Sequence, residues 1–221
     1  MLFPIGDDQI QGGYRPVVSY SLIVLNVLIF LFEASMGNTN LEAFIMHYGA
    51  IPAEITSGQD YYTLISSMFL HGSWMHLIGN MLFLWVFADN IEAVIGNFHF
   101  MVFYLLGGIV AALTHILLAP GSNVPMVGAS GAISAVMGAY VIMFPRSRVK
   151  VFFVVFFTSF NILALYFLGF WILQQVISGM SSLNANDLGE GVAWWAHIGG
   201  FAFGVLAGLY FKKTRPMLQL G

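Results

Sequence analysis

The sequence predicts an all-α membrane protein, a bundle of six transmembrane helices. Of its 221 residues, 59% are hydrophobic and only 8% are charged, whereas about 25% are charged in an average soluble domain. The mean hydropathy of +0.85 argues against a soluble fold as well. Because a spanning helix needs roughly 20 residues, this length accommodates about six spans in a single domain.

Apolar runs bounded by polar residues or by Pro and Gly mark the expected spans. A membrane barrel would need strands that alternate apolar and polar residues, but residues 151–157 are apolar throughout and therefore predict helix. The six helices are expected at residues 17–32, 74–88, 98–119, 130–144, 151–177 and 194–211. We expect residues 1–16 to be a short cytoplasmic segment, 17–211 the membrane domain and 212–221 a cytoplasmic tail.

The basic residues indicate how the helices are oriented. Six crossings place all seven on one side, which the positive-inside rule makes cytoplasmic, so both termini are expected there. The loops at 33–70, 120–129 and 178–193 then face outward: the first is expected to be a packed subdomain, and residues 178–191, rich in Gly and Ser, a mobile loop or lid. The basic residues are Arg15, Arg146, Arg148, Lys150, Lys212, Lys213 and Arg215.

Several kinds of chemistry receive no support from the sequence. There is no cysteine, which excludes disulfides, thiolate metal sites and a Cys nucleophile. His47 remains unassigned, and His99 and His115 are expected to be interfacial or hydrogen-bonded groups. No metal-binding pattern accompanies these histidines, so no metal is expected. The net charge of −3 is too small to carry an inference about partners, and no nucleic-acid partner is expected. The first 16 residues lack the basic region of a secretory signal, so the apolar run after them is expected to remain as a helix.

Ser130 and His197 stand out because polar groups at membrane depth are costly unless they are paired. Ser130 precedes Arg146 by 16 residues and His197 precedes Lys212 by 15, on helices that run in the same direction. At about 1.5 Å per residue, both lie on the order of 22 to 24 Å from the basic boundary. We expect them at one depth, a few ångströms below the outer surface.

Small residues on the fourth and sixth helices would allow these two side chains to meet. Gly200, Gly204 and Gly208 recur at four-residue spacing, and the fourth helix carries Gly131 and Gly138 with two alanines. A serine needs its base within about 2.6 to 3.2 Å to become nucleophilic. No carboxylate lies in the sixth helix, so a Ser-His dyad is expected rather than a triad.

Acyl transfer also requires hydrogen-bond donors for the developing oxyanion. The turn at 128–131 opens a helix whose first backbone N–H groups are unpaired, and His76 and Asn80 share a face of the second helix at a similar depth. Each of these polar residues alone is more often a packing or helix-tying group. Their convergence at one level favours a catalytic site.

The motifs resemble those of the rhomboid intramembrane proteases, in the same order: His71-x4-His76-x3-Asn80, Gly128-Ala129-Ser130-Gly131 and Ala196-His197-x2-Gly200. The resemblance covers residues 16–211. It implies cleavage of single-pass membrane proteins in or near their transmembrane segments within a lipid bilayer, without metal or cofactor. It further implies Ser130 as nucleophile, His197 as base, the oxyanion donors His76, Asn80 and the Ser130 amide, and structural positions at His71, Glu92, Gly128, Gly131, Ser134 and Gly200.

Two positions depart from patterns common among relatives. Tyr62 and Thr63 stand where many relatives have Trp-Arg, so anchoring of the first loop is expected to differ. Ser134 replaces a tyrosine that in some relatives packs on the catalytic histidine, so His197 is expected to be held by other aromatics or to be more mobile.

Two other functions fit parts of the sequence. A catalytically inactive rhomboid-like protein would bind transmembrane clients, but such relatives usually lose the serine or the histidine. A small transporter would need an inverted repeat or an intramembrane charge pair, and neither is present. The compact six-helix form indicates a multi-pass protein of a bacterial inner membrane.

Overall fold

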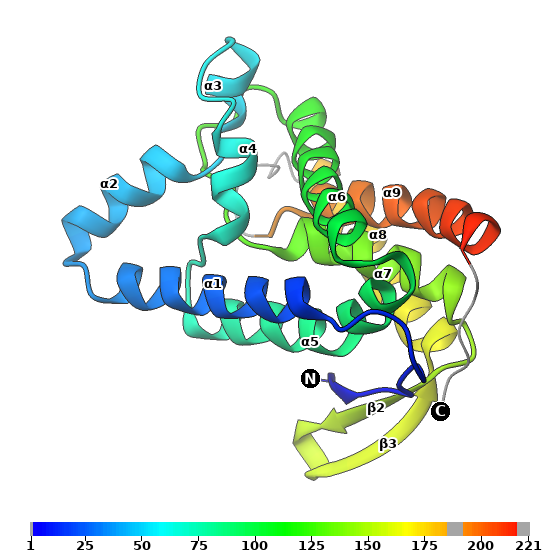
Figure 1. Ribbon diagram of the computed structural model, residues 1–221. Coiled ribbons are helices and arrows are strands. Elements are labelled where there is room, and N and C mark those ends of the chain that lie inside the picture. The colour runs from blue at the N-terminus through cyan, green and yellow to red at the C-terminus, as the bar shows by residue number, and fades with distance from the viewer. Residues whose placement is uncertain (1, 185–191, 216–221) are drawn as a thin grey trace.

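The structure is a computed structural model that describes residues 2–184 and 192–215 (Figure 1). Its helices surround a central apolar core, and a small sheet lies at one end. The elements are β1 (Leu2–Gly6), α1 (Val17–Ala34), α2 (Asn38–Tyr48), α3 (Pro52–Thr56), α4 (Thr63–Ser66), η1 (Ser67–Phe69), α5 (Trp74–Ile95), α6 (Asn97–Leu118), α7 (Ser130–Met143), β2 (Arg148–Phe153), η2 (Val154–Phe156), β3 (Thr158–Leu163), α8 (Ala164–Asn184) and α9 (Trp194–Thr214).

Within the described ranges, five helices are long and apolar enough to cross a membrane: α1, α5, α6, α8 and α9. The helix α7 is also apolar but has only 14 residues. All of the expected helical regions except 151–177 are helical over essentially their whole length. The protein is therefore mostly helical and consistent with a membrane bundle.

The short helix α7 forms the centre of the bundle and is buried along nearly its whole length. It ends at Met143 because Pro145 follows. Proline has no backbone N–H to donate, and its ring disfavours a helical conformation of the preceding residue. Fourteen residues extend about 21 Å, less than the roughly 30 Å of a hydrocarbon core. A residue at the start of α7 therefore lies below one membrane surface if the other end reaches the opposite surface.

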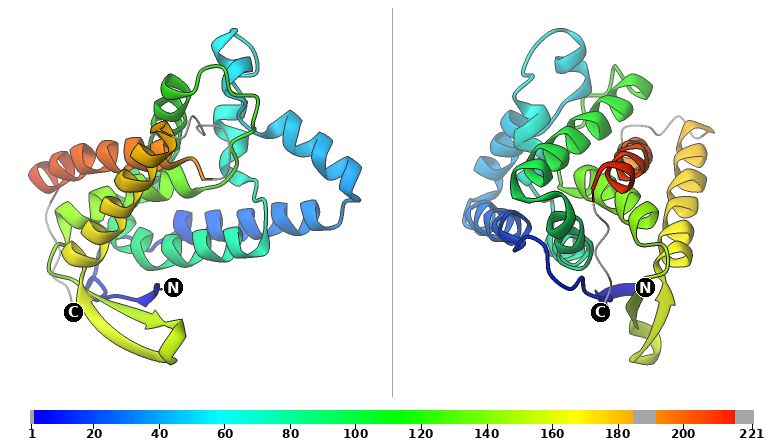
Figure 2. Two further views of the ribbon diagram at one scale, coloured as in Figure 1. Left: turned by 180° about the vertical axis from the view of Figure 1, so that it is seen from behind. Right: turned by 45° about the vertical axis from the view of Figure 1, so that its right-hand side comes forward.

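The neighbours of α7 are arranged so that α1 and α8 lie on opposite sides of the bundle (Figure 2). The helix α9 packs against α7 more extensively than any other pair of elements, and α6 packs against both. The helix α1 lies beside α5, and α8 contacts α9 and one side of α7. This arrangement brings the N-terminal ends of α7 and α9 together.

The expected fifth helix is wrong in its first half, and the fold is not entirely α-helical. Residues 148–163 form the hairpin β2–β3, and α8 begins only at Ala164. In β2 the side chains alternate, with Val149 and Val151 fully buried and Arg148 and Lys150 exposed. This is the period of two that belongs to a strand, and the Val- and Phe-rich composition favours strand as well.

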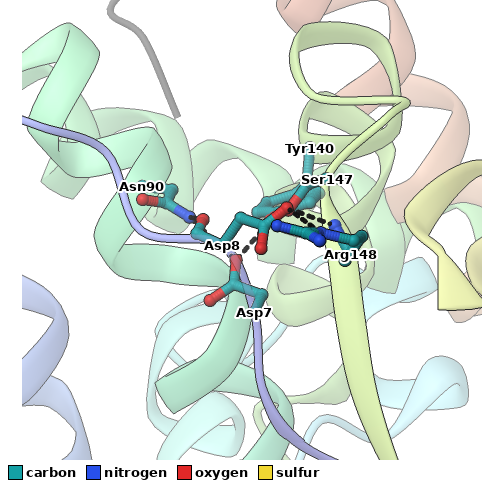
Figure 3. Close-up of polar contacts among 6 residues, drawn as sticks. All are labelled: Asp7, Asp8, Asn90, Tyr140, Ser147 and Arg148. Carbon is teal, nitrogen blue, oxygen red and sulfur yellow. Dashed lines mark hydrogen bonds and ion pairs between the residues drawn. The ribbon is translucent and has the colours of Figure 1, made fainter. Parts of the chain in front are cut away.

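The N-terminal segment is part of the fold rather than a separate extension. Strand β1 pairs antiparallel with β2, so the sheet order is β1-β2-β3. The carboxylate of Asp7 accepts hydrogen bonds from the Tyr140 hydroxyl and, at 2.8 Å, from Asn90 Nδ2 (Figure 3). The Asp8 carboxylate accepts a hydrogen bond from the Arg148 backbone N–H at 2.9 Å. It also forms an ion pair with the Nε of the Arg148 side chain at 3.2 Å. These contacts join the segment to α5, α7 and β2.

The connections that were expected to face outward differ in part from expectation. The first loop contains α2, α3, α4 and η1, of which α3 and α4 pack near the end of α6, whereas α2 buries no residue. Residues 178–184 of the expected mobile loop are helical and continue α8, and residues 185–191 lie outside the described part. Residues 212–214 of the expected tail continue α9, and residues 216–221 also lie outside it.

Candidate active site

Ser130 and His197 come together although they are far apart in the sequence. Ser130 is the first residue of α7 and His197 lies in the first turn of α9. The Nε2 atom of His197 is 2.8 Å from the Ser130 Oγ. This distance lies within the range at which a histidine can remove the proton of a serine hydroxyl. His197 is buried, whereas Ser130 is only half-buried and faces a cavity.

The close approach of α7 and α9 depends on glycine at their contact. A Cβ placed on Gly208 would lie 2.8 Å from the Ala139 Cα, and one on Gly204 would lie 2.7 Å from the backbone carbonyl carbon of Ala135. A Cβ on Gly200 would meet the backbone of Gly131. Side chains larger than hydrogen would hold the two helix axes apart and separate Ser130 from His197.

His76 and Asn80 approach the turn that precedes the serine. A Cβ placed on Gly128 would lie 2.7 Å from the Nε2 of His76 and 3.5 Å from the Nδ2 of Asn80. The Asn80 Nδ2 is buried and has no hydrogen-bond partner among the described residues. An unpaired buried donor is unusual, and a ligand oxygen could satisfy it.

A cavity of about 940 Å³ connects these groups. It is lined by Ser130, His197, His76 and Asn80 and is bounded by apolar and aromatic side chains of α5 and α8. Such a volume, with a few converging polar groups in an apolar wall, is typical of a ligand site.

Two aromatic rings flank His197 where the tyrosine of some relatives is missing. The ring centroids of Trp171 and Trp194 lie 5.8 Å and 6.3 Å from that of His197. Ser134 is fully buried and donates a hydrogen bond to the backbone carbonyl of Ser130 at 2.6 Å. Two tryptophan rings therefore lie beside the histidine, and Ser134 makes its hydrogen bond within α7.

One residue at the site is not predicted by the sequence motifs. Gln175, on α8, places its Oε1 2.8 Å from the Nδ1 of His197. A glutamine inside an apolar run is a polar group at membrane depth, the same signal that distinguishes the serine and the histidine. That signal alone does not place Gln175 at the site, because no spacing links it to either residue.

His71 precedes α5, and Glu92 lies near the C-terminal end of that helix. Glu92 is fully buried and accepts hydrogen bonds from the backbone N–H groups of Val18 and Ser19, at 2.8 and 2.7 Å, at the start of α1. His71 is buried and its ring centroid is 5.2 Å from that of His76. Burial, and secondarily the neighbouring His76, lowers the pKa of His71 to about 4, so its imidazole is neutral near pH 7.

Tyr62, His99 and His115 lie in three different parts of the structure. The Tyr62 hydroxyl donates a hydrogen bond to the backbone carbonyl of His47 at 2.8 Å. This bond connects two parts of the first loop without the Trp-Arg pair. His99 is exposed at the start of α6, whereas His115 is buried in the cavity wall. Across residues 2–184 and 192–215 no three His, Cys, Asp or Glu side chains cluster as metal ligands would. The expected absence of metal and cofactor stays a prediction.

Comparison with known proteins identifies similar sequences. Residues 58–214 match the Rhomboid domain. "Presenilin-associated rhomboid-like protein, mitochondrial" of Homo sapiens is 27% identical over 96% of this chain and 54% of its own length. "Rhomboid protein 1, mitochondrial" of Saccharomyces cerevisiae is 28% identical over 88% of this chain and 53% of its own length. The chain spans about half the length of these curated relatives.

These names contradict the expected location. The compact six-helix form indicates a bacterial inner-membrane protein, but the matched human and yeast proteins are named as mitochondrial. The expectation rested on the compact form alone, and this form does not identify the membrane in which the protein lies. The long apolar helices and the match to the Rhomboid domain still support an integral membrane protein.

Proposed function

Because this chain belongs to the rhomboid family, we propose that it is an intramembrane serine endopeptidase that uses Ser130 and His197 as a catalytic dyad. The observation that carries the proposal is the 2.8 Å distance between the His197 Nε2 and the Ser130 Oγ at the wall of a large cavity. The substrates are single-pass membrane proteins, cut in or near their transmembrane segments. Small, helix-destabilising residues near the scissile bond are expected, since a regular helix engages its carbonyls in internal hydrogen bonds.

In the first half of the reaction, the Ser130 Oγ attacks the scissile carbonyl carbon while its proton moves to the His197 Nε2. The carbonyl oxygen becomes negatively charged and accepts hydrogen bonds from the Ser130 backbone N–H, the Asn80 Nδ2 and the His76 ring. The carbon–nitrogen bond then breaks, and His197 gives its proton to the leaving amine. The product is an ester between Ser130 and the acyl half of the substrate.

In the second half, water replaces the amine. His197 takes a proton from the water as its oxygen attacks the ester carbon, and the same donors hold the oxyanion. The bond to the Ser130 Oγ breaks, and the proton returns from His197 to the serine. Each step uses side chains of the chain itself and needs no metal or cofactor.

The proposed topology counts α7 as a sixth span, with both termini on the side of the basic residues and residues 17–211 as the protease domain. The positive residues support it, because they cluster near the ends of the helices that would share this side. The names of the relatives support a mitochondrial membrane as the location. Fractionation of cells that express the tagged chain, followed by protease protection of each terminus, tests location and topology together.

The dyad is tested with purified protein, a fluorophosphonate probe and a model transmembrane substrate. We expect the probe to label Ser130, and Ser130→Ala and His197→Ala to abolish cleavage while their thermal unfolding in detergent stays unchanged. Ser181→Ala, on an exposed turn of α8, is the matched control and should cleave normally. Labelling at another residue, or full cleavage by Ser130→Ala, would contradict the mechanism, and substrate binding without cleavage by the wild type would indicate an inactive relative.

A further inference from the structure

Gln175 contacts the side of the His197 ring that faces away from the serine. It lies on α8 with only 4% of its surface exposed, and its Oε1 is 2.8 Å from the His197 Nδ1. The opposite ring nitrogen, Nε2, faces the Ser130 Oγ. His197 is thus held between one residue of α7 and one of α8. Gln175 belongs to none of the motifs that carry the family resemblance.

The hydrogen bonds of Gln175 determine which end of its amide faces the histidine. Its Nε2 donates to the backbone carbonyl of Trp171 at 3.2 Å, and a carbonyl oxygen can only accept. The amide oxygen therefore faces His197. Since that oxygen has no proton, the Nδ1 of His197 must be the donor, and in a neutral ring the Nε2 then carries the lone pair. This is the tautomer that can take the proton of Ser130.

Close packing of α8 on α9 maintains this contact. Gly179 lies one turn beyond Gln175, and a Cβ placed there would be only 3.2 Å from the Ile198 Cδ1 and 3.4 Å from the Trp195 ring. The two helices therefore approach closely beside the first turn of α9, which carries His197. Gln175 is held near the ring by the same packing that forms the wall of the cavity.

We propose that Gln175 is the positioning residue of His197: its amide oxygen accepts the Nδ1 proton, selects the reactive tautomer and holds the ring toward Ser130. The inference rests on the proposed protease function. When His197 receives the serine proton, Nδ1–H still donates to the amide, and no proton passes to Gln175. Among the described residues no carboxylate contacts His197, so a neutral amide takes the place that an aspartate has in a Ser-His-Asp triad.

The test compares two substitutions of similar size. Gln175→Met removes the acceptor at nearly constant volume, whereas Gln175→Glu keeps an oxygen at the same distance. We expect Gln175→Met to lower kcat and the rate of fluorophosphonate labelling roughly 10- to 100-fold, a part of the 10²–10⁴ that a positioned general base contributes. KM should stay within about twofold, because Gln175 acts on the base rather than on the substrate. Gln175→Glu should recover most of the lost rate.

Controls separate this inference from folding and from the proposed function. Leu173→Met, at an exposed position of the same turn, should leave both rates and the unfolding temperature unchanged. If Gln175→Met works at the wild-type rate, or if Gln175→Glu is no faster than Gln175→Met, the positioning role is wrong. Failure of the wild type itself to be labelled at Ser130 would instead contradict the proposed function.

Discussion

Gly128 shows how one residue shapes the site. Its φ angle of +120° lies in a region that residues with a Cβ rarely adopt, and a Cβ there would lie 2.7 Å from two atoms of the His76 ring. The turn therefore needs glycine for two independent reasons, backbone conformation and space. Both act directly on the geometry around the Ser130 N–H and its neighbouring donors.

We expect Gly128→Ala to reduce cleavage by at least about tenfold, because strain of about 1 to 3 kcal/mol and displacement of His76 would disturb the oxyanion donors. The measurement is the rate of substrate cleavage together with the rate of fluorophosphonate labelling. Gly121→Ala is the control, since a Cβ at Gly121 meets nothing within 4 Å. Wild-type rates for Gly128→Ala would show that His76 and this turn do not need their observed arrangement.

Polar residues in apolar runs can be recognised in the sequence, but only some of them can be assigned to a common site. Ser130 and His197 can be paired from the sequence because their distances from basic residues place them at one depth. Gln175 cannot, because the helix that carries it begins at Ala164 and not at residue 151 as expected, so the count from the basic residues does not give its depth. Which side chains meet across three helices depends on the rotation of each helix about its axis.

At the scale of elements, the contact between α7 and α9 determines how close Ser130 and His197 lie. The glycines of α9 at four-residue spacing face the α7 backbone. An added Cβ would have the least space at Gly204, which lies against Ala135. This close contact places the two N-terminal ends, and with them the dyad, at one level. The spacing itself is visible in the sequence.

We expect Gly204→Ala to destabilise the protein by about 1 to 3 kcal/mol, because the added methyl group must push α9 away from a backbone that cannot yield. The rate of Ser130 labelling should fall with it. Thermal unfolding in detergent and labelling of the folded fraction measure these effects. Gly169→Ala in α8 is the matched control, because a Cβ there meets nothing within 4 Å and alanine favours a helix. An unchanged unfolding temperature for Gly204→Ala would contradict the role assigned to the glycines of α9.

At the scale of the whole molecule, Asp7 joins the first residues of the chain to distant elements. Burial, the largest of several influences, raises the pKa of Asp7 to about 7. The charged groups facing it include Asp89 of α5, and Arg148 pairs with the adjacent Asp8. A carboxyl group whose pKa is higher in the folded state stabilises that state fully below its unfolded pKa of about 4, and this contribution is lost as the pH rises through about 7.

We therefore expect the docking of β1 to weaken between about pH 6 and pH 8. Hydrogen-exchange protection of the β1 amides, corrected for the intrinsic rate at each pH, should fall over this range. Asp7→Asn should make protection independent of pH there, because it mimics the uncharged form, whereas Asp60→Asn in the exposed first loop should behave like the wild type. A pH dependence that persists in Asp7→Asn would assign the effect to another group.

The sequence by itself determined the long apolar helices except for the start of the fifth, the common level of Ser130 and His197, and the small residues that let their helices approach. It could do so because hydropathy, charge and spacing act along the chain and are local properties. Only the tertiary structure decided that residues 148–163 form a hairpin, that β1 pairs with β2 although they lie far apart in the sequence, and that Gln175 reaches His197. These features depend on pairing between distant segments and on helix rotation. Periodicity alone does not distinguish a strand from a helix in an apolar run such as 151–157.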